Sequence, residues 1–428
     1  MAPMASVELA EAPAKRKVRL PQPEPGLTPD AMVERARALI PMLRAQQDEA
    51  DALGRYTEEA HQAFKQAGFY RALQPKMFGG YEFGFPDFLR VVMEIGRGHP
   101  GAAWCFTLTS SHPLVVGAHF PEETQAEIFG PEGDFRAPHR APPGGKWKRT
   151  DGGYIVNGRW SYSSGIPVAT HFIGGGLIEA QDDQPQRLVN FIVPKAEVAV
   201  LPDWGGGASL GMDASGSNTV ELKDVFVPDR RLFREDILVT SEGFGPGDGQ
   251  GAQLHGNPMY HGVVGGFFHA TFGGIYVGAA RAALDDYEET ARTTGAYRKP
   301  GVTRLHDLDT QTPFGRALTL TDCAEALTLQ VAQICMDQCA RAVRDGTPVT
   351  VADTIKVWDM ARQAVLMACD AIELLFRTSP VRAANRGQRM QRYLRDVQMY
   401  RIHPSSQPWL DPARARSHWG MPINRYGH

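Results

Sequence analysis

The sequence predicts an α+β protein in which an N-terminal helical domain and a C-terminal helical bundle flank a central antiparallel β-domain. Apolar residues recur at helical spacing up to about residue 130, short strand-like runs follow to about 235, and long amphipathic stretches return after 258. We expect a flexible N-terminal arm over 1–27, a helical domain over 28–133, the β-domain over 134–240, and a four-helix-bundle domain with a Gly-rich loop over 241–428.

The N-terminal domain is predicted to contain at least four helices. Apolar residues recur every 3.6 positions over 31–53, and Pro41 should interrupt that helix. A second helix is expected to begin at Thr57, which is a favourable N-cap before two glutamates. Further helices are expected after Pro86 and over 102–120.

The central and C-terminal parts differ sharply in residue composition and pattern. Runs such as GGYIVNGRWSYSSG, THFIGGGLI and NTVELKDVFVP are β-branched or aromatic and are broken by turn residues, which predicts an antiparallel sheet or a small barrel. The stretch 241–258 is rich in glycine and should form a long loop beside a site. Long helices are then expected from about 265, over 313–345 and over 352–377.

Composition excludes several classes of function. The net charge of −3 and the mixed signs along the chain argue against nucleic acid as a partner. No run of 18 apolar residues and no signal-peptide pattern is present, so we expect a cytoplasmic protein with no membrane partner. An odd number of cysteines predicts buried thiols in a reducing compartment, rather than disulfides or a metal site. The five are Cys105, Cys323, Cys335, Cys339 and Cys369.

Three motifs occur in an order that resembles the acyl-CoA dehydrogenase superfamily from about residue 30 to 420. The first is DGGYIVNGRWSYSSGIPVAT, similar to the strand-turn-strand that lies along the flavin ring. The second is LGMDASGSNTVELKDVFVPDRRL, and the third is the Arg-Asp step MQRYLRDVQMYRIH before the last helices. The resemblance implies the α-β-α fold of that superfamily and a flavin cofactor.

The residues after Arg395 and Asp396 indicate the branch of the superfamily. Dehydrogenases of this fold commonly place a catalytic glutamate there, and Pro404 occupies that position in this chain. Proton abstraction next to a carbonyl requires a base, which proline lacks. The preceding residue, His403, matches a histidine of the flavin monooxygenases of this scaffold, and His112 matches a second one.

The resemblance therefore implies the oxygenase component of a two-component flavin-dependent monooxygenase. Such an enzyme uses reduced FMN or FAD and O2, through a C4a-hydroperoxyflavin, to hydroxylate a small aromatic, phenolic substrate. No Gly-x-Gly-x-x-Gly follows a predicted strand, so reduced flavin is expected from a separate flavin reductase. The resemblance also implies a homotetramer, because the flavin of this family lies at subunit contacts.

Three side chains are predicted to take part in the chemistry. His403 is the candidate base that turns a phenol into the more reactive phenolate. Ser164 is the candidate acceptor for the flavin N5–H, with Ser163 as its close rival. His112 is expected either to steady the hydroperoxide or the substrate hydroxyl, or only to cap the helix before Pro113.

The remaining cofactor candidates follow from the motifs. Trp160 and Tyr162 either contact the flavin or belong to the strand core, and a bulge or turn between them would let one face each way. Ser215 and Ser217 suit the ribityl or phosphate oxygens of the flavin. The resemblance offers Arg298 as a phosphate ligand, although a surface charge explains this residue better.

Two other functions remain open at this level. An acyl-CoA dehydrogenase with a displaced base would place its carboxylate elsewhere, and Glu373 is then the candidate. A relative that has lost catalysis and serves only as a binding module would no longer bind flavin.

Overall fold

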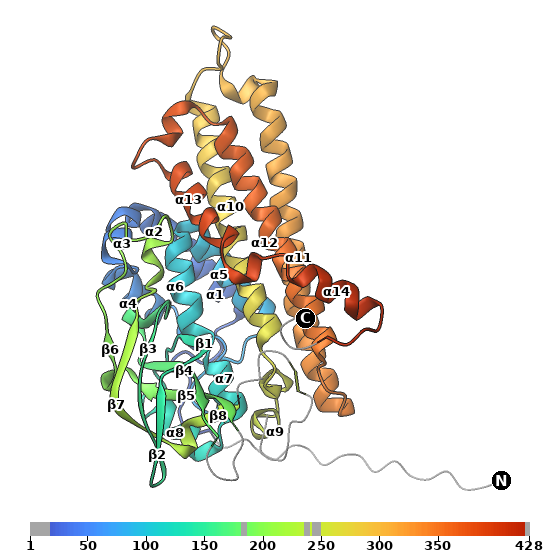
Figure 1. Ribbon diagram of the computed structural model, residues 1–428. Coiled ribbons are helices and arrows are strands. Elements are labelled where there is room, and N and C mark those ends of the chain that lie inside the picture. Colours follow the sequence, from blue (N-terminus) through green and yellow to red (C-terminus); the bar gives the residue numbers. More distant parts are fainter. Residues whose placement is uncertain (1–17, 181–185, 235–239, 242–249, 424–428) are drawn as a thin grey trace, which may run out of the picture.

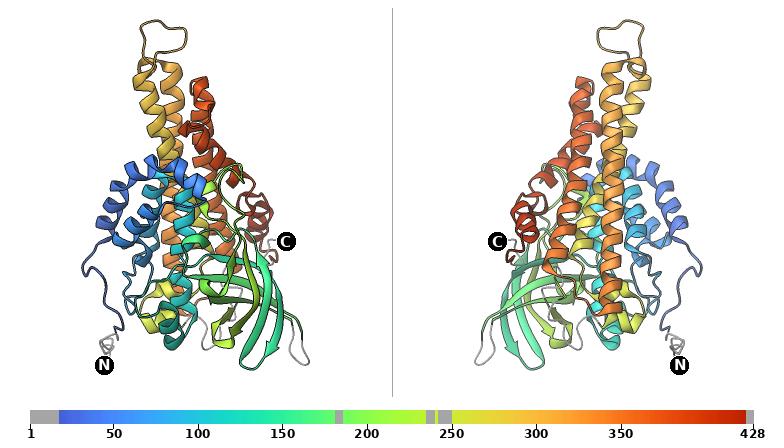
Figure 2. Two further views of the ribbon diagram at one scale, coloured as in Figure 1. Left: turned by 90° about the vertical axis from the view of Figure 1, so that its left-hand side faces the viewer. Right: turned by 90° about the vertical axis from the view of Figure 1, so that its right-hand side faces the viewer.

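The computed structural model describes residues 18–180, 186–234, 240–241 and 250–423. In this part of the chain a helical N-terminal part and a β-domain lie against long C-terminal helices (Figures 1 and 2). The α+β class and the order of the three parts are as the sequence predicts.

The N-terminal helices follow the predicted pattern with two differences. The predicted helix over 31–53 forms three short helices, because the chain breaks at Leu39, ahead of Pro41, and again at Gln46. The predicted helix over 102–120 is split before Pro113, which has no backbone N–H to continue the helical ladder. The helices are α1 (Pro29–Ala38), α2 (Ile40–Ala45), α3 (Gln47–Leu53), α4 (Glu58–Gln66), α5 (Phe85–Gly98), α6 (Pro100–Ser110), α7 (Pro113–His119) and α8 (Glu122–Phe129).

The β-domain consists of two four-stranded sheets, ordered β1-β4-β5-β8 and β2-β3-β7-β6. The pairs are antiparallel, as predicted for this domain, except for β1 and β4, which run parallel. The strands are β1 (His139–Gly144), β2 (Lys146–Thr150), β3 (Gly153–Trp160), β4 (His171–Ile178), β5 (Arg187–Pro194), β6 (Ala199–Val200), β7 (Val220–Pro228) and β8 (Leu232–Arg234).

The C-terminal part is built on long helices that pack along one another. A capping box between Thr350 and Asp353 starts α12, and Pro313 lies inside α11, in its second turn. Residues 242–249 of the predicted Gly-rich loop lie outside the described residues, and the rest contains the short helix α9. The helices are α9 (Gly251–His255), α10 (Gly265–Thr293), α11 (Leu308–Asp345), α12 (Val351–Thr378), α13 (Arg389–Arg401) and α14 (Leu410–His418).

Close contact between α5 and α10 joins the N-terminal helices to the bundle. A Cβ atom on Gly278 would lie 2.3 Å from the Met93 carbonyl oxygen and 2.8 Å from the Cα atom of Gly96. Only glycine permits two helix backbones to approach this closely. This contact fixes α10, which carries several of the site residues described below.

Four of the five cysteines are buried thiols, as predicted, and Cys323 is exposed. Burial raises the pKa of Cys339 to about 12, which keeps that thiol protonated. Within the described ranges, no helix has the length and apolar character needed to cross a membrane.

Candidate functional site

A chain of three serine hydroxyls links the two motifs that the sequence assigned to flavin. The Ser164 Oγ lies 2.7 Å from the Ser217 Oγ, which in turn lies 2.7 Å from the Ser215 Oγ. Ser163 is 1% exposed, and its hydroxyl donates to the Trp160 carbonyl at 2.9 Å. Since Ser163 is buried and engaged, Ser164 is the serine of the pair whose hydroxyl can meet a ligand.

Two glycines bring these motifs together. Gly165 (φ +91°) donates its N–H to the carbonyl oxygens of Ser215 and Gly216, at 3.0 and 2.9 Å. A Cβ on Gly165 would lie 2.0 Å from the Thr109 Oγ1, and Gly216 also has a positive φ of +63°. Side chains at these positions would push the serine loops apart, so the glycines of both motifs are required by close packing.

The Trp160 and Tyr162 side chains point to opposite sides of the β3 end. Trp160 is 2% exposed, donates its indole N–H to the Gly175 carbonyl at 2.9 Å, and packs against Phe172 in the β-domain core. This burial corresponds to the strand-core alternative that the sequence left open for Trp160. Tyr162 has a left-handed φ of +59° and is 63% exposed. The expected turn is thus present, and it reverses the direction of the tyrosine.

The surroundings of Tyr162 fit a planar aromatic cofactor. The Tyr162 ring stands edge-on to Trp204, with 5.8 Å between ring centroids. The Trp204 indole N–H is buried and has no acceptor within the described residues. An exposed aromatic ring, an orphaned donor and a terminal serine hydroxyl are groups that a flavin could use.

His403 lies directly after α13 in a cage of aromatic rings. Ring centroids of Phe272, Trp104 and Tyr400 lie 5.2, 5.7 and 6.2 Å from its own. Burial and then the positive charge of Arg140 lower the pKa of His403 to about 4, so its ring is neutral near pH 7.

The hydrogen bonds of His403 fix its tautomer. Its Nδ1 accepts the Ser405 N–H at 3.2 Å. A neutral imidazole that accepts at Nδ1 carries its hydrogen on Nε2. In this arrangement the free nitrogen of His403 is a hydrogen-bond donor.

His112 lies in a different hydrogen-bonding environment. Its Nδ1 donates to the Ala137 carbonyl at 2.7 Å, and its ring also interacts with the backbone of Leu108. The side chain makes no capping hydrogen bond to α7, so the alternative role as a helix cap does not apply. Burial lowers the pKa of His112 to about 3, and His139 and Phe268 have ring centroids 5.6 and 4.8 Å away.

His269, which no sequence motif singles out, lies on α10 close to this aromatic cage. Its Nδ1 donates to the Gly265 carbonyl at 3.0 Å, so its Nε2 is also unprotonated. It stacks on Trp358 at 4.3 Å and meets Phe272, which contacts His403 as well. The run GGFFHATFGG carries this residue, but a lone histidine in an apolar helix gives no local signal of a site.

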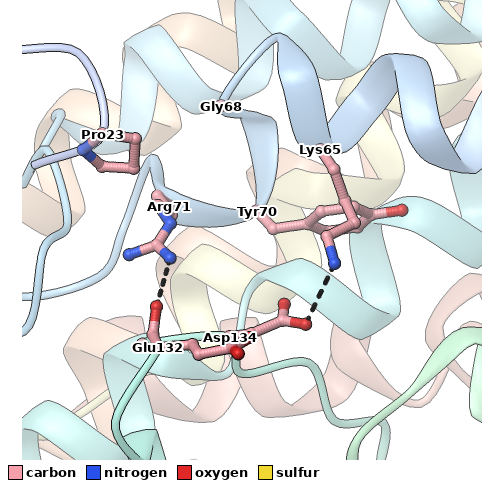
Figure 3. A pocket seen from close by; sticks show the side chains of 8 residues that line it. Pro23, Lys65, Gly68, Tyr70, Arg71, Glu132 and Asp134 are labelled. Atoms are coloured by element: carbon pink, nitrogen blue, oxygen red, sulfur yellow. Dashed lines mark hydrogen bonds and ion pairs between the residues drawn. The ribbon is translucent and has the colours of Figure 1, made fainter.

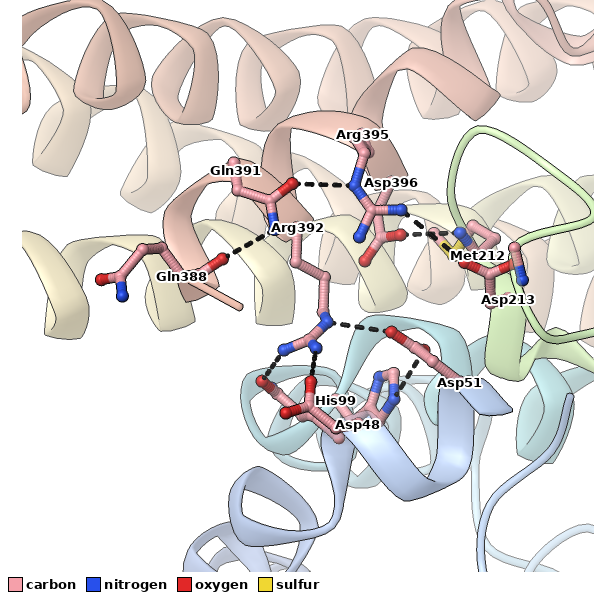
Figure 4. A network of polar contacts seen from close by, with 12 residues as sticks. Asp48, Asp51, His99, Met212, Asp213, Gln388, Gln391, Arg392, Arg395 and Asp396 are labelled. Atoms are coloured by element: carbon pink, nitrogen blue, oxygen red, sulfur yellow. Dashed lines mark hydrogen bonds and ion pairs between the residues drawn. The ribbon is translucent and has the colours of Figure 1, made fainter. Parts of the chain in front are cut away.

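The Arg395–Asp396 pair holds α13 against the loop that leads into the serine chain (Figure 4). The Asp396 Oδ1 accepts the Met212 N–H at 2.7 Å, and Arg395 donates to the Leu210 carbonyl at 2.8 Å. A Cβ on Gly211 would lie 2.6 Å from the Arg395 carbonyl oxygen. The Arg-Asp motif therefore positions His403 and the serine loop relative to each other.

The neighbouring Arg392 extends this network to the N-terminal helices. It donates to Asp51 at 2.9 Å and to the Gln47 Oε1 at 2.7 Å. Asp51 also lies 3.3 Å from the His99 Nε2 at the start of α6 (Figure 4). All three parts of the chain thus meet at α13.

Two residues considered from the sequence lie elsewhere. Arg298 is exposed between α10 and α11, and its guanidinium lies over the Tyr297 ring, as a surface charge would. Glu373 accepts hydrogen bonds from Arg401 and Gln398, at 3.1 and 3.2 Å. Its carboxylate is therefore engaged in an ion pair and is not offered as a base.

A separate open cavity of about 200 Å³ lies between α4, η1 (Phe69–Arg71) and the chain before β1 (Figure 3). Lys65 lies 3.3 Å from the Asp134 carboxylate, and Arg71 donates to the carbonyls of Glu132 and Gly79. Both cations have internal partners, so this cavity lacks the free polar groups that characterise the loop at Ser164.

Comparisons with known proteins agree with this geometry. Residues 270–408 match the family model "Acyl-CoA dehydrogenase, C-terminal domain". The chain is 28% identical over 400 residues, 91% of its length and 99% of the relative's, to the flavin-dependent monooxygenase oxygenase subunit HsaA of Rhodococcus jostii. It is 27% identical to the oxygenase component of p-hydroxyphenylacetate 3-hydroxylase of Acinetobacter baumannii, over 68% of this chain and 69% of that one.

A solved structure is similar over nearly the whole chain. The 3-HSA hydroxylase from Rhodococcus sp. RHA1 superposes with a TM-score of 0.81 at 26% identity, covering 93% of this chain and 99% of that one. The fold is therefore that of the acyl-CoA dehydrogenases. Within that fold, the chain is similar over most of its length to oxygenase components of flavin-dependent monooxygenases.

Proposed function

We propose that this chain is the oxygenase component of a two-component monooxygenase that hydroxylates a small phenolic compound. The observation that carries the proposal is the neutral imidazole of His403 in its aromatic cage, one residue before the position at which a dehydrogenase would place a carboxylate. Pro404, in the slot of that carboxylate, has no group to abstract a proton. The names of the relatives support an aromatic substrate and a separate reductase.

Reduced flavin, FMN or FAD, would react with O2 in this site and supply an electrophilic oxygen atom. Ser164 would accept the hydrogen bond of the flavin N5–H while it donates to Ser217. Ser217 and Ser215 would reach the ribityl or phosphate oxygens. The Tyr162 ring would cover the isoalloxazine edge, and the apolar walls would exclude water.

The histidines of the site differ in whether the free ring nitrogen can donate or accept a proton. His403 presents Nε2–H to the substrate oxygen, and to act as the base it would first have to release the Ser405 N–H and change tautomer. His269 offers an unprotonated Nε2, whereas the His112 ring already interacts with the backbone of Ala137 and Leu108. His269 is therefore the better-placed acceptor for a substrate proton.

The proposal also includes the oligomeric state of the protein and its location in the cell. A homotetramer in the cytoplasm agrees with the family resemblance and with free thiols in a reducing compartment. Sedimentation equilibrium should give four times the mass of the 47.0 kDa chain. A monomer at micromolar concentration would contradict this part of the proposal.

The test is rapid mixing of the protein and reduced flavin with O2, with and without candidate phenols. We expect flavin reoxidation to be slower than in buffer, and a hydroxylated product when a phenol is present. The Ser164→Ala variant should release about tenfold more hydrogen peroxide per product, the effect of losing one buried hydrogen bond. Ser417→Ala on α14 is the matched control and should behave as wild type.

Two results would end the proposal. One is reoxidation as fast as in buffer together with no product from any phenol. The other is desaturation of an acyl-CoA thioester, which would restore the dehydrogenase alternative.

A further inference from the structure

Arg140 on β1 is a cation without a counter-charge. Its Nε donates to the Ser161 carbonyl at 2.8 Å, and its side chain is half-buried. Among the described residues, no carboxylate lies within ion-pair distance of this guanidinium. By contrast, Arg136 is paired with Asp134, and Arg159 lies 2.7 Å from Glu221.

The position of Arg140 joins the two halves of the site. Ser161, which holds it, lies between the core residue Trp160 and the exposed Tyr162. On the other side, its charge reaches His403 and contributes to the lowered pKa of that ring. Burial lowers the pKa of Arg140 itself, and Tyr162 raises it by less. An unpaired, partly desolvated cation between a cofactor loop and a substrate cage calls for an anionic ligand.

The groups around this point are donors. The Arg140 guanidinium has N–H groups beyond the one given to Ser161, and the free nitrogen of His403 carries a hydrogen. The titratable groups that interact with the pair are Tyr162 and His139 beside Arg140, and His269 and Tyr400 beside His403. No acid of the described residues is among them.

We propose that Arg140 and His403 bind the substrate hydroxyl as an anionic oxygen, so that this protein selects phenolate over phenol. The proposal rests on the proposed function, because it presumes a phenolic substrate. The phenol O–H bond breaks as the substrate binds, the proton passes by way of the unprotonated Nε2 of His269 to solvent, and the electron pair stays on the oxygen. Arg140 then determines specificity, since it favours phenols that ionise readily.

The experiment is difference absorbance spectroscopy of 4-nitrophenol binding to the protein saturated with oxidised flavin. The phenolate and phenol forms of this probe absorb at different wavelengths. The oxidised flavin ring is neutral, so the assay reports on the phenol alone. We expect the bound probe to remain phenolate at least about one pH unit below its free ionisation point, which corresponds to a tenfold preference.

Substitutions at Arg140 distinguish the effect of its positive charge from the effect of its size and shape. Arg140→Met should bind 4-nitrophenolate at least tenfold more weakly, yet bind the neutral analogue 4-nitroanisole as wild type does. Arg140→Lys restores a charge and should recover part of the preference. Arg159→Met removes a 67% exposed arginine from the adjacent part of the β-domain and is the control, with no expected change.

The proposal is overturned if wild type binds the probe as neutral phenol. It is also overturned if Arg140→Met weakens phenolate and 4-nitroanisole equally, since charge would then play no part. Failure of the proposed function would appear instead as absence of hydroxylation in the flavin-mixing experiment, while the binding preference can still be measured.

Discussion

The buried carboxyl of Asp396 gives the sharpest quantitative prediction. The residue is 3% exposed, and its Oδ2 has no partner within the described part of the chain. Burial, and then the charge of Asp51, raise its pKa from 3.8 to about 7. Between pH 4 and 7 the folded protein therefore holds a proton that the unfolded chain has lost. Stability contributed by this group is fully present below pH 4 and decreases as the pH rises to 7.

The size of the effect on stability follows from the shift in the pKa of Asp396. A difference of about three pKa units corresponds to about 4 kcal/mol of unfavourable ionisation above pH 7. Asp396→Asn keeps an oxygen to accept the Met212 N–H and has no charge to bury. For a chain of this length, 4 kcal/mol corresponds to about 4–5 °C in melting temperature. The variant should melt about that much higher than wild type at pH 8 and nearly level with it at pH 4.

The assay is thermal melting of both proteins at intervals from pH 4 to 8, with Asp285→Asn as the contrasting control. Burial alone would raise the Asp285 pKa, but hydrogen bonds from Arg97 and Arg44 lower it. That variant should therefore be less stable than wild type at pH 8, and the difference should fade as the pH falls through the folded pKa. The reasoning is refuted if Asp396→Asn shifts the melting temperature equally at pH 4 and pH 8, or lowers it at pH 8.

Four further predictions follow from the site and its supports. Gly211→Ala should cost about 1–3 kcal/mol of unfolding free energy in a denaturant titration, because its Cβ would overlap the Arg395 carbonyl; an unchanged midpoint would contradict the packing argument. His403→Gln should keep more hydroxylation than His403→Ala in product assays, since glutamine retains an N–H donor, and equal loss would count against a donor role. Glu373→Gln should leave hydroxylation of phenols intact, whereas its complete loss would favour the dehydrogenase alternative. In a thiol-labelling assay, only Cys323 should react quickly in the native protein, and all five cysteines after denaturation.

The sequence by itself determined the order of elements and the class of chemistry. Local signals are strong where caps and prolines act, as at Thr57, which accepts the Ala60 N–H at the start of α4. The loss of the catalytic carboxylate at Pro404 can also be inferred from the sequence alone, because proline has no titratable group. The helical and strand periodicities reflect which faces are buried, and that information is local.

Only the tertiary structure decided which candidates come together. It placed Trp160 in the β-domain core, left Tyr162 exposed, and buried the Ser163 hydroxyl in a hydrogen bond to the Trp160 carbonyl. Periodicity cannot separate these cases, because a single left-handed residue reverses the side-chain direction.

The tautomers of the histidines and the unpaired charge of Arg140 likewise depend on partners distant in sequence. The Ala137 carbonyl that sets His112 lies 25 residues away, and Arg140 acts on His403 from another domain. Hydrogen-bond direction and burial arise from contacts that form only when the three parts of the chain pack. For that physical reason the fold could be predicted from local pattern, while the roles of the individual side chains required the packed structure.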